Sequence, residues 1–139
     1  MTNRSLQLIV ENQDPLTLGP GDSIQEACAQ MWERRVGATL VVNGGKLVGI
    51  FTGRDAVRIL AEGRDPVHTT LAAVMTRNPD SLPSTAHAID ALNQMRDCGY
   101  RHIPVVDGEK LVGIVSRSDF EGRELELFEE ETTLWERTA

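Results

Sequence analysis

The sequence lacks a long apolar run, a surplus of basic residues and a disulfide framework. No apolar stretch approaches the ~20 residues that a membrane span needs, and the first residues, Met-Thr-Asn-Arg-Ser-Leu, contain no apolar core of a signal peptide. Lys and Arg number 14 against 21 Asp and Glu, for a net charge of −7, whereas a general nucleic-acid binder shows a basic face. We therefore expect a cytoplasmic protein without membrane or nucleic-acid partners.

Catalytic and metal-binding motifs are also missing. The three histidines, His68, His87 and His102, are isolated and lack metal-ligand spacing. No Gly-x-Ser-x-Gly motif occurs, and Gly45-Lys46 is followed by Leu, so it is no P-loop. We expect no enzyme activity, no metal and no required cofactor.

The two cysteines, Cys28 and Cys98, do not occupy equivalent positions of the repeat described next. They are interpreted as reduced small hydrophobic residues, with a disulfide or a metal pair as the alternative.

What the sequence does contain is an internal repeat. Shifted by 64 residues and without a gap, residues 15–55 match residues 79–119 at 14 of 41 positions. Two copies of one unit fill most of the chain, so function is expected to come from the unit or from its pairing. Each copy, of roughly 60 residues, would be marginally stable alone, and we expect the two to pack into one body.

Each copy shows the same order of predicted elements, β-α-β-β-α. After an X-Pro turn and a short apolar stretch, apolar residues at three- and four-residue steps predict a helix, whose N-caps are expected at Asp22 or Ser23 and at Ser84 or Thr85. Two apolar runs joined by Asn43-Gly44 or Asp107-Gly108 then predict a hairpin, because both turn residues need positive φ. A last helix is expected at Asp55–Ala61 and from Asp119 onward.

The second copy contains Pro-Val-Val-Asp-Gly-Glu-Lys-Leu-Val-Gly-Ile-Val-Ser-Arg-Ser-Asp at residues 104–119. This pattern resembles the CBS (cystathionine β-synthase) domain, and two in tandem resemble a CBS pair, or Bateman module, of the small stand-alone bacterial type. The resemblance implies an α+β fold with two β-α-β-β-α repeats packed with pseudo-two-fold symmetry. We assign residues 8–66 and 72–125 to the repeats and 126–139 to an acidic helical tail.

The polar turn at the end of each copy carries the candidate chemistry. Ser116-Arg117-Ser118-Asp119 and Thr52-Gly53-Arg54-Asp55 lie where a strand becomes a helix. Free backbone N–H groups there attract phosphate, hydroxyls donate to it, and a carboxylate can accept the two hydroxyls of a ribose. Ser/Thr-x-x-Asp is equally the form of a simple capping box, and both interpretations can hold together.

The resemblance implies two ligand sites, each built from both copies. Site one would use Thr17, Val36, Gly37 and Ala38 with Ser116, Ser118 and Asp119. Site two would use Thr76, Asp80, Tyr100, Arg101 and His102 with Thr52, Arg54 and Asp55. Because site two is richer in cationic groups, it suits a di- or triphosphate, and site one a monophosphate. For Arg101 and His102, a solvated strand edge is the alternative.

The C-terminal segment, residues 120–139, has seven Glu and two Arg, hence −5 of the net charge. Leu125, Phe128, Leu134 and Trp135 lie near one stripe of a predicted helix, with Glu on the other face. The stripe packs on its own module or contacts a partner, with Trp135 as a possible anchor.

These features predict a non-enzymatic regulatory module that binds an adenosine-containing nucleotide. AMP is the first expected ligand, and ATP, ADP, NAD and S-adenosylmethionine are alternatives. A homodimer and an effector protein are the expected partners. The alternative is a ligand-free interaction scaffold, and a nucleotide hydrolase is a weaker rival.

Overall fold

The structure is a computed structural model that describes residues 3–120, 124–126, 128–130 and 132. It has two units with a mixed α+β fold. The first-repeat unit comprises Asp14–Pro79 with Glu109–Leu111, and the second-repeat unit comprises Met1–Gln13, Asp80–Gly108 and Val112–Ala139.

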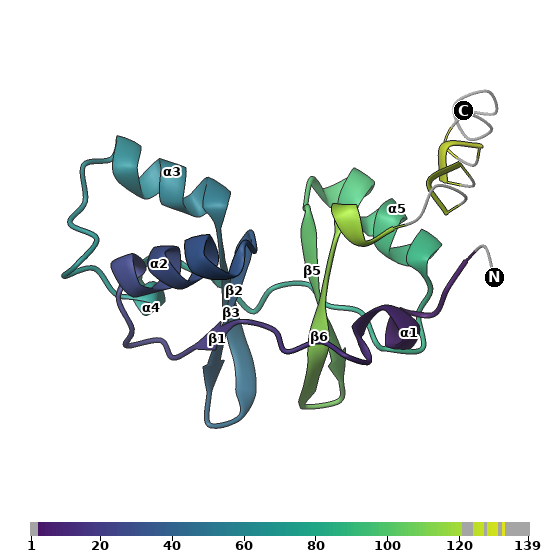
Figure 1. Cartoon of the computed structure of the whole chain (residues 1–139), viewed down its shortest axis with the longest axis horizontal. Helices are drawn as coiled ribbons and strands as arrows, with labels where there is room; N and C mark the ends of the chain where they lie inside the picture. Colours follow the sequence, from purple (N-terminus) through teal and green to yellow (C-terminus); the bar gives the residue numbers. More distant parts are fainter. Residues whose placement is uncertain (1–2, 121–123, 127, 131, 133–139) are drawn as a thin grey trace. The chain divides into compact units, whose positions relative to one another are not determined.

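The first-repeat unit is built on a four-stranded sheet with the order β1-β2-β3-β4. β1 runs parallel to β2, and the two later pairings are antiparallel. Figure 1 shows the helices α2 and α3 together on one face of this sheet. The elements are β1 (Thr17–Leu18), α2 (Ile24–Arg34), β2 (Ala38–Asn43), β3 (Lys46–Thr52), α3 (Gly53–Ala61), α4 (Leu71–Val74) and β4 (Thr76–Arg77).

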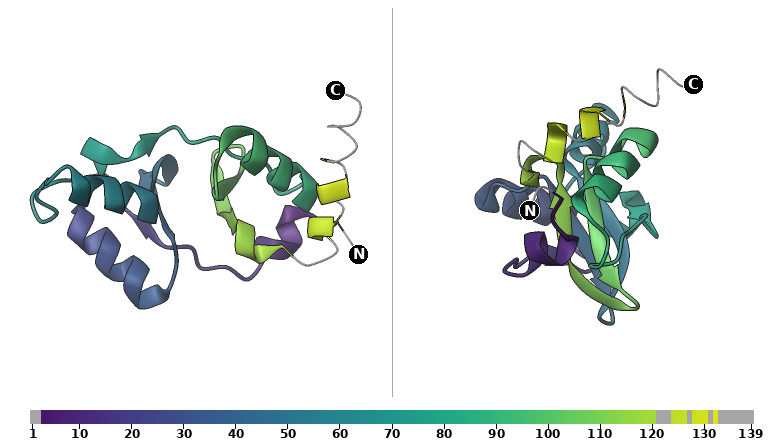
Figure 2. Two further views of the ribbon diagram at one scale, coloured as in Figure 1. Left: turned by 90° about the horizontal axis from the view of Figure 1, so that it is seen from above. Right: turned by 90° about the vertical axis from the view of Figure 1, so that its right-hand side faces the viewer.

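The core of the first-repeat unit lies between these helices and the sheet. Phe51 and Val41 on the strands meet Ala27 and Met31 of α2 and Ile59 of α3. The apolar steps of three and four residues in α2 thus face the sheet, as the periodicity predicts. In the left view of Figure 2, α2 and α3 lie side by side, next to the strands of this unit.

The turn between β2 and β3 lies one residue later in the chain than predicted. Asn43 pairs with Lys46 as the last residue of β2, and the two turn residues are Gly44 (φ 60°) and Gly45 (φ 79°). Two consecutive residues with positive φ favour glycine at both places, which is why the turn uses Gly44-Gly45 rather than Asn43-Gly44. The prediction for the second hairpin is wrong in the same way, because Asp107 is the last residue of β5 and does not have positive φ, whereas Gly108 has φ 62°.

The second-repeat unit packs one long helix and a short N-terminal helix against a two-stranded sheet. Its strands are β5 and β6, and Leu82 adds an isolated parallel bridge to Val105. The elements are α1 (Leu6–Val10), α5 (Ala88–Cys98), β5 (His102–Asp107), β6 (Lys110–Ser116) and the 3-10 helix η1 (Arg117–Asp119).

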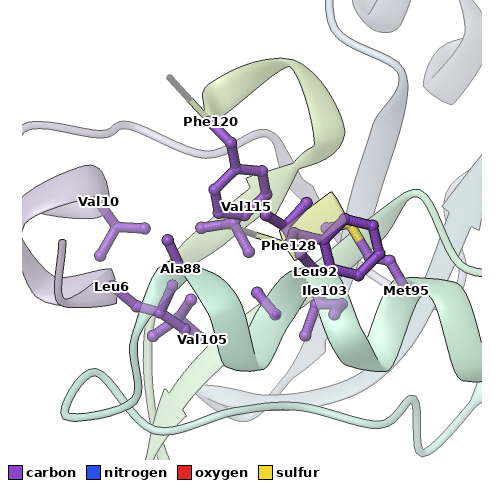
Figure 3. Packing of buried hydrophobic residues seen from close by; sticks show 11 residues of the cluster. Leu6, Val10, Ala88, Leu92, Met95, Ile103, Val105, Val115, Phe120 and Phe128 are labelled. Atoms are coloured by element: carbon purple, nitrogen blue, oxygen red, sulfur yellow. The ribbon is translucent and has the colours of Figure 1, made fainter. Parts of the chain in front are cut away.

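The core of this unit joins segments that are far apart in the sequence. Figure 3 shows Leu6 and Val10 of α1, Leu92 and Met95 of α5, and Phe128 around one apolar cluster. Its further buried members are Ala88, Ala91, Ile103, Val105, Val115 and Phe120.

The leading segment of each repeat packs on a strand of the other repeat. The α1 segment lies against β6, where a Cβ on Gly113 would come within 2.7 Å of Val10 Cβ. β4, at the start of the second repeat, pairs with β3 through Gly49 and Arg77, and a Cβ on Gly49 would come within 3.1 Å of the Thr76 carbonyl oxygen. Gly49 and Gly113 are equivalent in the repeat, and both allow a close approach.

The end of the second repeat departs from the predicted element order. The helix expected from Asp119 onward is one 3-10 turn, after which Phe120 is extended (φ −89°, ψ 141°) and 7 % exposed. The extended backbone is coupled to burial of the Phe120 ring in the core. Helix is found again at residues 124–126, 128–130 and 132.

The N-cap of α5 also differs from the prediction, because it is His87 rather than Ser84 or Thr85. Ser84 is buried, and its hydroxyl donates to Asp107 Oδ2 at 2.6 Å. The side chain of Asn3 supplies a cap instead, with Oδ1 accepting from Ile89 N–H at 3.0 Å. In α2, Ser23 is the N-cap, as predicted.

The C-terminal segment packs on its own unit where it is described. Phe128 is 6 % exposed, and the guanidinium groups of Arg96 and Arg117 each lie 5.4 Å from its ring centroid. Glu124 contradicts the prediction that Glu fills the exposed face, because it is 2 % exposed and pairs with Arg4. Leu134 and Trp135 lie outside the described residues.

Candidate functional site

The first candidate turn, Thr52–Asp55, begins α3. The Thr52 N–H donates to Asp55 Oδ2 at 2.9 Å, and the Asp55 N–H donates to Thr52 Oγ1 at 3.4 Å. This is the predicted capping box, and it occupies one carboxylate oxygen. The other, Oδ1, lies 3.6 Å from the Arg58 guanidinium. Arg54 is exposed beside them at the helix start.

The second candidate turn, Ser116–Asp119, has the same arrangement on η1. The Ser116 N–H donates to Asp119 Oδ2 at 2.6 Å, and the Ser116 hydroxyl lies 3.2 Å from the same oxygen. The Ser116 and Ser118 hydroxyls are hydrogen-bonded at 2.9 Å. Within the described part of the chain, Asp119 Oδ1 accepts no hydrogen bond. The turn therefore presents a carboxylate oxygen and two hydroxyls together.

In each unit a predicted loop lies directly beside the turn of the same unit. The Gly53 N–H donates to the Gly37 carbonyl at 3.0 Å, and Ala38 pairs with Thr52. In the second-repeat unit the Arg117 N–H donates to the Arg101 carbonyl at 3.2 Å. Residues that the sequence assigns to different sites thus meet at one end of the same unit.

The remaining predicted residues have separate places. Thr17 and Thr76 are exposed on the two edge strands, where Thr17 pairs with Leu40 and Thr76 with Ile50. Since Leu40 also pairs with Ile50, these four residues form one row across the sheet. Val36 is 40 % exposed in the loop before β2.

Tyr100 and Asp80, both predicted for site two, contact each other. The Tyr100 hydroxyl donates to Asp80 Oδ2 at 2.7 Å, and both side chains are exposed. This hydrogen bond is the main cause that raises the pKa of Tyr100 above its ordinary value. The shift has this direction because the hydrogen bond to a carboxylate favours the protonated hydroxyl.

His102 is the one predicted site residue with a burial-driven shift. Burial lowers the pKa of His102, nearby Asp119 opposes this by favouring the charged ring, and Arg101 adds to the lowering. A neutral imidazole is therefore favoured at pH 7.

Two arginines near the turns were missed by the sequence reasoning. Arg58 lies one helical turn after Asp55, and its i,i+3 spacing is a signal that was available. Arg4 donates to the Asp119 carbonyl at 2.9 Å across more than a hundred residues. No local pattern in the sequence predicts that contact.

Other candidate chemistry is not found among the residues that the structure describes. No group of three His, Cys, Asp or Glu side chains there could hold a metal ion. Cys28 and Cys98 are both free, and Cys98 is exposed rather than packed. Of the helices described, none has the length and apolar character to cross a membrane.

Comparison with known proteins agrees with the repeat and its motifs. The CBS domain family model matches residues 9–62 and 71–122. The Bacillus subtilis CBS domain-containing protein YhcV is 39% identical over 104 residues, which cover 74% of each chain. The chain spans only 16–19% of the length of the Arabidopsis thaliana and fission yeast relatives that it matches at 33–40% identity.

Solved structures share the fold. The CBS domain protein PAE2072 from Pyrobaculum aerophilum, described in complex with AMP, has a TM-score of 0.81 at 25% identity, covering 91% of this chain and 98% of that one. The CBS domain pair of protein MJ0100, described with 5'-methylthioadenosine and S-adenosyl-L-methionine, has a TM-score of 0.77 at 27% identity, covering 92% and 98%. The two family matches, the YhcV relative and the fold together show that this chain belongs to the CBS domain family, as a tandem pair.

Proposed function

We propose that the chain is a non-enzymatic regulatory module that binds adenosine-containing nucleotides, with AMP as the first candidate. The observation that carries the proposal is the arrangement of Asp119. Its Oδ2 atom caps the turn, while Oδ1 accepts no hydrogen bond from the described residues and lies on the same turn as the hydroxyls of Ser116 and Ser118, which are hydrogen-bonded to each other. A carboxylate of this kind accepts ribose hydroxyls, and the hydroxyls donate to phosphate. The complexes of PAE2072 and MJ0100 with adenosine compounds support the same class of ligand.

The two turns differ in charge, which supports ligands with different numbers of phosphate groups. Arg54 stands at the start of the nine-residue α3, whose N-terminus attracts anions, whereas Ser118 is the equivalent residue in the second repeat. With Arg101 and His102, Arg54 favours a di- or triphosphate. The grouping of these residues into two sites that each draw on both repeats stays a prediction, as do the homodimer and the effector protein.

A scaffold without a ligand is the second candidate. The capping boxes explain both aspartates structurally, so an interaction module would need no nucleotide. Regulation by a nucleotide instead requires that the ligand bind two states of the module with different affinity.

Calorimetry with AMP, ATP and NAD tests the proposal. Asp119→Asn and Asp55→Asn keep an oxygen that can accept the cap but lose the charge offered to ribose. We expect each to weaken binding at its own turn by about 10–100-fold, which corresponds to roughly 1.5–3 kcal/mol.

Asp90→Asn is the matched control. Asp90 Oδ2 accepts from the His87 N–H at 2.9 Å in the same capping geometry on α5, but Asp90 belongs to neither candidate turn. It should leave affinity unchanged. Absence of heat at millimolar nucleotide with folded protein would favour the scaffold.

A further inference from the structure

Arg4 forms a buried two-pronged ion pair with Glu124. Its Nε donates to Glu124 Oε2 at 3.1 Å and its Nη2 to Oε1 at 2.9 Å, while its backbone N–H also donates to Oε2 at 3.0 Å. The Glu124 side chain is 2 % exposed. Because a buried carboxylate is costly without such partners, the pair fixes the guanidinium in one place.

The same nitrogen that contacts Glu124 also holds the candidate turn. Nη2 of Arg4 donates to the carbonyl oxygen of Asp119 at 2.9 Å. Asp119 is the last residue of η1, which has only three residues, and so short a 3-10 helix has few hydrogen bonds of its own. The capping box restrains Ser116–Asp119 from within, and Arg4 restrains it from outside.

The first repeat does not need such a restraint. There the turn continues into α3, which runs to Ala61 and buries Ile59 in the core. The residue equivalent to Arg4 is Thr69, because its carbonyl accepts from the Ile24 N–H at 3.0 Å as the Arg4 carbonyl accepts from the Ala88 N–H at 2.8 Å. Threonine carries no guanidinium that could hold the turn. In the second repeat the helix ends before Phe120, and the hydrogen bond from Arg4 restrains the turn instead.

We infer that Arg4 is a positioning residue for nucleotide binding at the Ser116–Asp119 turn, acting through the Asp119 carbonyl and anchored by Glu124. The expected effect of Arg4 on nucleotide affinity rests on the proposed function. Its effect on the turn itself can be measured without any ligand.

The test uses the full chain labelled with ¹⁵N, and two variants. In Arg4→Met/Glu124→Met, both charges of the pair are removed together, so neither is left buried without the other. In Arg4→Lys, the carboxylate keeps a cation, but one ammonium cannot reproduce the planar fork that spans Glu124 and Asp119. Arg34→Met is the control, because Arg34 also donates to a backbone carbonyl, that of Asp14, but in the other unit.

Two readouts distinguish positioning from general stability. Hydrogen exchange of the Ser116 amide should accelerate at least tenfold in the double variant and less in Arg4→Lys, while the core amides of Ile103 and Val105 change little. AMP titration should show at least tenfold weaker binding at Ser116, Ser118 and Asp119 in the double variant, with unchanged affinity at Thr52 and Asp55. Arg34→Met should behave as the unaltered chain.

A folded Arg4→Lys or double variant with unchanged Ser116 exchange overturns the inference, and so does acceleration shared equally by all amides of the unit. If AMP fails to bind the unaltered chain, the proposed function fails, and the exchange of Ser116 alone decides the role of Arg4.

Discussion

The side chain of Gln13 forms two hydrogen bonds with the backbone of Ile114, as a neighbouring strand would. Its Nε2 donates to the Ile114 carbonyl at 2.6 Å, and its Oε1 accepts from the Ile114 N–H at 2.9 Å. β6 has β5 on one side, and this amide satisfies part of its other edge, which would otherwise be an unpaired row of backbone groups.

Gln13→Met is therefore expected to destabilise the chain. The variant keeps the length of the side chain but leaves a partly buried N–H and carbonyl of Ile114 without this partner, at a cost of about 1–3 kcal/mol. Urea unfolding measures the change. Gln7→Met, at an exposed position of α1, should change stability by less than about 0.5 kcal/mol; equal losses in the two variants would refute a special role of Gln13.

Gly113→Ala tests the close approach of the α1 segment to β6. The new Cβ would lie 2.6 Å from Gln13 Oε1 and 2.7 Å from Val10 Cβ, so backbone must shift, at a cost of about 1–3 kcal/mol for overpacking. Thermal unfolding gives the readout. Gly21→Ala is the control because a Cβ there meets nothing within 4 Å, and a similar melting temperature for both variants would contradict the contact.

Thr39→Val should stabilise the first-repeat unit. Thr39 is fully buried, and its Oγ1 has no hydrogen-bond partner among the residues described. Valine has the same shape without the hydroxyl, so unfolding free energy should rise by about 1 kcal/mol.

Ser84→Ala is the contrasting case for a buried hydroxyl. Ser84 Oγ donates to Asp107 Oδ2 at 2.6 Å, so its removal should lower stability by about 1–2 kcal/mol. Opposite signs for the two variants are expected in denaturant unfolding, and a loss of stability in Thr39→Val would show that its hydroxyl is satisfied.

His102 should make stability depend on pH in a definite direction. Because burial lowers the pKa of His102 in the folded chain, the unfolded chain, with a pKa of about 6.5, takes up the proton first as pH falls. The stabilising contribution is thus complete above about pH 7 and is lost as pH falls through 6.5 toward the folded pKa.

The measurement is urea unfolding between pH 7.5 and 5. His102→Gln should reduce the slope of stability against pH in this window, whereas His68→Gln, at an exposed position, should retain it. An unchanged slope in His102→Gln would rule out this residue as the source.

The periodicity and the apolar runs were enough to predict the order of elements in the first repeat, though not which residues form its hairpin turn. Apolar spacing located α2 and α5, and the two apolar runs located the hairpins to within a residue, because these patterns depend on neighbours in the sequence. The capping boxes at Thr52 and Ser116 were predicted for the same reason.

Contacts over long sequence separations were not predicted. α1 and α4 are too short to show a period, and their positions depend on β6 and on the core of the first-repeat unit. Gly113 is visible in the sequence, but what approaches it is not. The 3-10 turn at Asp119 likewise follows from burial of Phe120, which no local propensity encodes.

The pairing of Gln13 with Ile114 also sets an order of events during synthesis. Chains are made from the N-terminus and domains tend to fold as they emerge, but Gln13 must wait for a partner 101 residues downstream. Nearly all of the first-repeat unit is available once Pro79 has been made, so it can fold while the α1 segment still has no surface to pack on. The α1 segment, although made before the first repeat, would then reach its native contacts after it, and the apolar residues Leu6 and Val10 would stay exposed in the interval.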